Sequence, residues 1–89
     1  MSESQEIERG ARAERLLKDP LLSEAFESVR QAIFAKIEET PLRDRDALHE
    51  WRLMLKLLRD VRANLEQAVQ GGKYAAFRLE EKRRFKLFG

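Results

Sequence analysis

The sequence predicts an all-α protein: a helical hairpin or three-helix unit with a long heptad-patterned helix and a basic helical C-terminal tail. Ala, Leu, Glu, Lys, Arg and Gln dominate and are strong helix formers, whereas the β-branched residues that favour strands are few. Apolar residues recur at helical spacing, and both prolines stand between helical stretches. A chain of 89 residues builds one domain with a thin core, so we expect it to form homo-oligomers.

The first predicted helix covers about residues 3–18. It is mostly polar, and Gly10 in its middle costs about 1 kcal/mol of helix stability relative to Ala. We therefore expect this helix to be ordered only when it docks against the rest of the chain. The alternative is a frayed N-terminal arm.

A second helix is predicted over about residues 20–39. Asp19 and Pro20 favour a helix start, because Asp caps free N–H groups and Pro fits the first helical position. Five apolar residues at steps of three or four form one face of this helix: Leu22, Phe26, Val29, Ile33 and Ile37. Thr40 and Pro41 then end the helix.

The third predicted helix covers about residues 44–70 and carries the strongest pattern in the chain, with Asp44 or Asp46 as its cap. Seven apolar residues alternate in steps of four and three, as in a coiled-coil seam, and we expect them to mediate self-association: Ala47, Trp51, Met54, Leu58, Val61, Leu65 and Ala68. We expect Gly71 and Gly72 to end this helix, because glycine readily adopts the left-handed C-cap conformation.

Residues 73–89 form a predicted tail that is basic, aromatic and helical in composition, set apart from a helical body of residues 1–72. The body holds 12 basic and 14 acidic residues, whereas the tail holds six basic and two acidic ones. We expect ten tail residues to bind a partner protein: Tyr74, Phe77, Arg78, Lys82, Arg83, Arg84, Phe85, Lys86, Leu87 and Phe88. Two alternatives stay open: nucleic-acid binding by the same cations and aromatics, or a solubilising end that folds back.

The sequence contains no pattern typical of catalysis, so we expect no enzymatic activity, no cofactor and no metal site. His49 is the sole histidine, there is no cysteine, and a helical zinc site needs a second histidine where Leu53 stands. We expect a cytoplasmic protein, because the N-terminus resembles no secretory signal and the apolar runs are too short to span a membrane.

Several stretches resemble small helical proteins of tailed phages and prophages. The resemblance covers about residues 10–73 and rests on helix punctuation and leucine spacing in residues 9–13, 16–22, 24–26, 51–53 and 69–73. Such proteins tend to be encoded among head and packaging genes. The resemblance implies a role in capsid assembly or DNA packaging, as a scaffold-like or small-terminase-like factor in the host cytoplasm or the virion.

The leading hypothesis is therefore a non-enzymatic phage protein for head assembly or DNA packaging. Its long helix self-associates, and its tail docks a capsid, portal or terminase component. The alternatives are a DNA-binding accessory protein that uses the basic tail, and a small phage inhibitor of a host protein.

Overall fold

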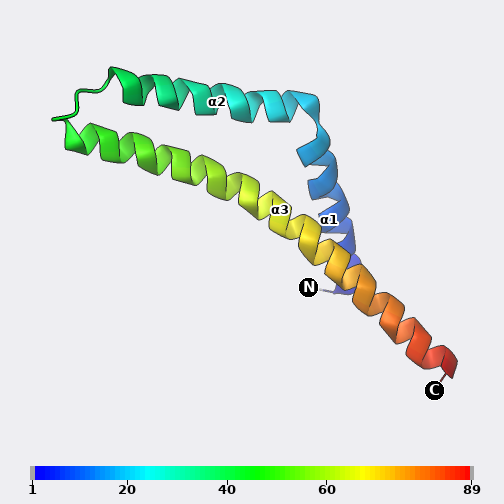
Figure 1. Ribbon diagram of the computed structural model, residues 1–89. Helices are drawn as coiled ribbons and strands as arrows, with labels where there is room; N and C mark the ends of the chain where they lie inside the picture. Colours follow the sequence, from blue (N-terminus) through cyan, green and yellow to red (C-terminus); the bar gives the residue numbers. More distant parts are fainter. Residues whose placement is uncertain (1, 89) are drawn as a thin grey trace. The chain divides into compact units, whose positions relative to one another are not determined.

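The described part of the chain is all-α, as the sequence predicts, and it forms three helices rather than three helices and a separate helical tail. The computed structural model describes residues 2–88, with side chains up to Lys86. The helices are α1 (Glu3–Lys18), α2 (Pro20–Glu39) and α3 (Arg45–Phe88), and they occur in that order along the chain (Figure 1). The predicted bounds of the first two helices, 3–18 and 20–39, are confirmed.

The helix starts follow the capping predictions. The Asp19 carboxylate accepts hydrogen bonds from the backbone N–H groups of Leu21 (2.8 Å) and Leu22 (3.4 Å). Asp44 caps α3, because its carboxylate accepts a hydrogen bond from the N–H of Ala47 (3.2 Å). These side chains satisfy donors that a helix leaves without partners in its first turn.

The described helices form two compact units, and α3 contributes to both. The first unit is a helical hairpin of residues 19–63, in which α2 runs antiparallel to the first part of α3 (Figure 1). Ile33 is buried between the two helices, and seven neighbours on the facing sides are half-buried: Leu22, Phe26, Ile37, Leu48, Trp51, Leu55 and Leu58.

The second unit pairs α1 with residues 64–88 of α3. The two backbones come very close at Gly10 and Gly72. A Cβ atom built on Gly72 would lie 2.9 Å from the Gly10 Cα atom and 3.1 Å from the Glu6 carbonyl oxygen. Ala13 and Ala75, one turn further along their helices, are buried beside this contact. Small residues thus let α1 lie directly against α3.

The prediction that the third helix ends at residue 70 is wrong. α3 continues for 44 residues to Phe88, and none of its glycines has a positive φ angle. Gly71 and Gly72 are therefore helix-interior residues, and Gly72 provides the space for α1. The predicted boundary between body and tail at residue 72 does not coincide with a helix end, and residues 73–88 belong to the same unit as α1.

The described part of the chain has a thin apolar core. Its buried apolar residues are Ala13, Ile33 and Ala75, and no large side chain within residues 2–86 is fully buried. Many large apolar side chains are instead exposed on both units. No helix in the described residues is long and apolar enough to cross a membrane.

Candidate partner-binding surfaces on α3

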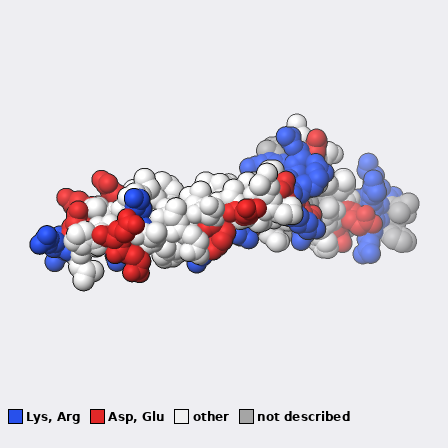
Figure 2. Space-filling view, turned by 90° about the horizontal axis from the view of Figure 1, so that it is seen from above, with Lys and Arg blue, Asp and Glu red and all other residues white. Residues whose placement is uncertain are grey.

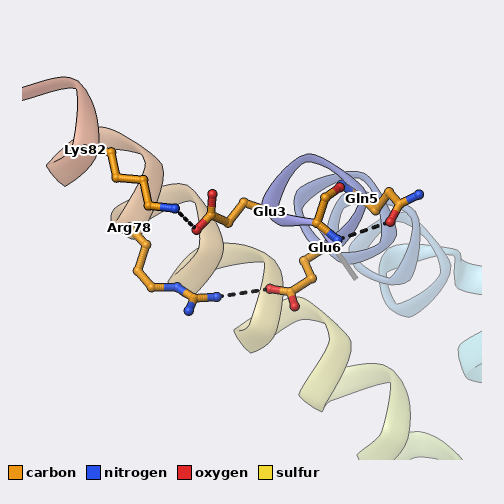
Figure 3. A network of polar contacts seen from close by, with 6 residues as sticks. Glu3, Gln5, Glu6, Arg78 and Lys82 are labelled. Carbon is orange, nitrogen blue, oxygen red and sulfur yellow. Dashed lines mark hydrogen bonds and ion pairs between the residues drawn. The ribbon is translucent and has the colours of Figure 1, made fainter. Parts of the chain in front are cut away.

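Two ion pairs hold α1 against the tail part of α3 (Figure 3). The Lys82 Nζ atom lies 2.7 Å from the Glu3 Oε1 atom, and the Arg78 Nη2 atom lies 3.5 Å from the Glu6 Oε2 atom. Both pairs are partly exposed, so each contributes little to stability by itself. Together with the glycine contact, they fix which face of α3 lies under α1.

The ion pair with Lys82 also shifts the pKa of the Glu3 carboxyl. A hydrogen bond from Lys82 lowers the pKa of the Glu3 carboxyl below its ordinary value of 4.5, although desolvation works in the opposite direction. The positive charges of Lys82 and Arg78 lower this pKa further. The carboxylate form of Glu3 is therefore the one that holds α1 to α3.

A face of α3 beside its contact with α1 carries a row of exposed aromatic side chains, and Tyr74 borders a hollow that it shares with Glu6 and Arg9 of α1. We call Tyr74, Phe77 and Phe85 the aromatic face; their exposed fractions are 62%, 61% and 78%. Glu81 lies in the same row, since residues 74, 77, 81 and 85 follow one another at steps of three or four. The Arg78 guanidinium lies 4.9 Å from the centre of the Tyr74 ring, so one cation contacts both α1 and the aromatic face.

The predicted tail residues divide into three groups. Tyr74, Phe77 and Phe85 share the aromatic face, as their spacing suggests. The cations Arg78 and Lys82 pair with α1, and Arg84 lies 4.0 Å from Glu81 on its own helix. Arg83 and Lys86 are exposed. The side chains of Leu87 and Phe88 lie outside the described part of the structure.

The predicted self-association seam is divided between the two units. Ala47, Trp51 and Leu58 are half-buried in the hairpin. Leu65 and Ala68 are half-buried in the unit that contains α1, and the Ala68 carbonyl faces Gly10. Met54 and Val61 are exposed, with exposed fractions of 48% and 54%. Met54 and Val61, in the middle of the seam, are therefore the seam residues that another molecule can contact.

The hairpin has one charged side and one apolar side. An open hollow of about 350 Å³ on the charged side is lined by four apolar residues and by four charged residues of the two helices, which are Glu27, Arg30, Arg59 and Arg62. At 100° per residue, six exposed uncharged residues fall on the opposite side, which we call the apolar side: Ala25, Val29, Ala32, Met54, Leu57 and Val61. The sequence-based site prediction included Met54 and Val61 but missed the α2 residues, which only the pairing of the helices reveals.

Charge is distributed unequally between the units. The unit that contains α1 has ten basic and seven acidic residues, whereas the hairpin unit has eight basic and nine acidic ones. Figure 2 shows basic side chains gathered around α1. The excess comes from residues 64–89, because the four basic and four acidic residues of α1 balance. Sequence reasoning did not single out three exposed arginines of α1: Arg9, Arg12 and Arg15.

Comparison of the chain with protein-family models, curated proteins and solved structures found no match. Within the described residues, no three His, Asp or Glu side chains are placed to share a metal ion. His49 is exposed on α3.

Proposed function

We propose that this chain is a non-enzymatic interaction protein that binds a partner protein through the aromatic face of α3. The observation that carries the proposal is the exposure of Tyr74, Phe77 and Phe85 on one face of a helix whose neighbouring face lies against α1. Exposed aromatic rings in a row are costly in water and are enriched at the energetic centres of protein interfaces.

The spacing of the row fits a helix that lies in a groove of its partner. Such helices place their anchors at positions i, i+3, i+7 and i+11, which here are residues 74, 77, 81 and 85. Three of the four anchors are aromatic, and Glu81 occupies the remaining one. Because α1 covers a neighbouring face of α3, the row is presented to solvent without further rearrangement, which lowers the entropy cost of binding.

Charge on the aromatic face favours a protein partner over a nucleic acid. Glu81 lies in the middle of the row, where it would repel a phosphate backbone. Three of the six tail cations, Arg78, Lys82 and Arg84, already form ion pairs within the chain. Their charge is therefore partly neutralised before any phosphate approaches. The aromatic rings instead suit a groove with apolar walls.

The proposed setting is phage head assembly or DNA packaging, with a capsid, portal or terminase component as the partner. This part of the proposal depends on the resemblance of residues 10–73 to small phage proteins. An adaptor of that kind needs no active site. It needs a displayed binding face such as the one on α3.

The test is co-purification of the tagged chain with the products of its neighbouring genes. We expect the double variant Tyr74→Ala/Phe77→Ala to lose capture of the partner, while far-UV circular dichroism shows unchanged helix content. Phe34→Ala, an exposed aromatic of the hairpin unit, is the matched control and should retain capture. Equal capture by wild type and the double variant would contradict the proposal.

A truncation gives a second test. Deleting residues 83–89 removes Phe85 but keeps Lys82 and its ion pair with Glu3. We expect weaker capture together with an intact pairing of α1 and α3. Full capture by the truncated chain would limit the binding face to Tyr74 and Phe77.

DNA binding is the second candidate function, and the basic excess of the unit that contains α1 favours it (Figure 2). A complex held by phosphate contacts weakens steeply as salt rises, whereas a complex held by buried aromatic rings does not. Titration of a duplex DNA at low and moderate salt therefore separates the two candidates. Absence of DNA binding at low salt would exclude this second candidate function.

A further inference from the structure

We propose that the apolar side of the hairpin binds the same side of a second copy of this chain, with the two hairpins parallel. Ala25, Val29 and Ala32 of α2 would lie on α3 of the other copy, where they meet the exposed apolar residues around Leu57. This inference concerns the hairpin unit and is independent of partner binding by the aromatic face.

All six residues of the apolar side are exposed in the hairpin unit, so this side is open to burial against another molecule. The composition of the apolar side also fits an interface. Three large side chains, Met54, Leu57 and Val61, are exposed by 48%, 55% and 54% on α3. The α2 part of the apolar side consists of Val29 and two alanines, which allow a second helix to approach closely. A flat apolar side between two helices is the surface that hairpins bury when they pair into four-helix bundles.

Charges at one end of the apolar side favour a second copy and a parallel arrangement. Near the α2–α3 loop, the next residues in the same two rows are Lys36 on α2 and Glu50 on α3. Lys36 lies 3.7 Å from Glu39 on its own helix, but this exposed pair is weak and can be exchanged for another carboxylate. A two-fold axis parallel to the helices places α2 of one copy over α3 of the other. Lys36 of each copy then faces Glu50 of its neighbour. An antiparallel arrangement provides no such match.

The primary test is the oligomeric state of the full chain, measured by sedimentation equilibrium. We expect wild type to be dimeric at micromolar concentration. Met54→Glu and Leu57→Glu should each raise the dimer dissociation constant about a hundredfold, because each leaves an unpaired charge in the interface. Both side chains are about half exposed, so the hairpin should keep its helix content, which circular dichroism checks.

Leu42→Glu is the matched control, since it makes the same chemical change at a loop position that is 89% exposed and off the apolar side. It should leave the dimer unchanged. A monomeric wild type would overturn the proposal, as would a Leu57→Glu chain that dimerises like wild type. A wild-type chain that is monomeric alone but uses the apolar side for a different protein also overturns it.

A charge exchange tests the arrangement. Lys36→Glu and Glu50→Lys should each weaken self-association, because both interfacial pairs become repulsive. An equimolar mixture of the two variants should form a mixed dimer with attractive pairs restored. A mixture no tighter than the separate variants would overturn the parallel arrangement. Tyr74→Ala/Phe77→Ala should dimerise normally, which separates this inference from the proposed partner-binding function.

Discussion

Replacing each of the two adjacent glycines of α3 by alanine should change stability in opposite directions. A Cβ atom at Gly71 meets nothing within 4 Å. Gly71→Ala should therefore stabilise the protein by about 1 kcal/mol, the usual difference between glycine and alanine inside a helix. For a chain of this size, that gain corresponds to a rise in Tm of roughly 4–8 °C.

Gly72→Ala gives the same helical gain but meets the backbone of α1. Its Cβ atom would lie 2.9 Å from the Gly10 Cα atom and 3.1 Å from the Glu6 carbonyl oxygen, and neither atom can rotate away. The helices must separate, and overpacking of this kind typically costs about 1–3 kcal/mol. The helical gain is common to both variants, so we expect Gly72→Ala to be less stable than Gly71→Ala by the overpacking cost of about 1–3 kcal/mol.

Urea unfolding followed by circular dichroism measures the difference, and hydrogen exchange of the α1 amides shows whether α1 has detached. Gly10→Ala is the reciprocal variant, since its Cβ atom would lie 2.9 Å from the Ala68 carbonyl oxygen. Combining Gly10→Ala with Gly72→Ala should cost less than the two separate losses, because one new side chain already separates the helices. If Gly72→Ala stabilises as much as Gly71→Ala and α1 stays protected, the close contact does not exist.

Two further predictions concern the helix start and the ion pairs. Asp19→Ala should destabilise the hairpin by about 1 kcal/mol in urea unfolding, because the amides of Leu21 and Leu22 lose their acceptor. An unchanged midpoint would contradict the capping role. The lowered pKa of Glu3 means that its pair with Lys82 stabilises the fold above pH 4.5 and stops doing so as pH falls through the lowered value. Carboxyl NMR titration should show Lys82→Met raising the pKa of Glu3 towards 4.5, and no change would refute the pairing.

Local signals predicted the helices well because they depend on short stretches of sequence. The Asp19–Pro20 start fixed the boundary between α1 and α2, and the apolar spacing of α2 was sufficient to find its buried face. The prediction of where α3 ends was wrong for a different reason. A glycine pair is typical of a helix end and also of a close contact between helices, and only a distant residue, Gly10, decides between the two.

The candidate site could be predicted in part. The common face of Tyr74, Phe77 and Phe85 follows from their spacing alone. The pairing of Arg78 with Glu6 and of Lys82 with Glu3 does not, since many acids and bases in this chain are equally available at the sequence level. The apolar side of the hairpin is formed by residues of both helices, so the apolar pattern of α3 alone predicted only residues on α3.

The contact between Gly10 and Gly72 also indicates how distant relatives of this chain are to be recognised. Leucine spacing is shared by a great many unrelated helical proteins and changes freely as long as the apolar character is kept. Two backbones in contact allow no such freedom, so glycine should recur at both positions while residue 71 varies. A glycine in the first helix, matched to one 62 positions later in the last helix, is a more discriminating signature than any apolar pattern in the sequence.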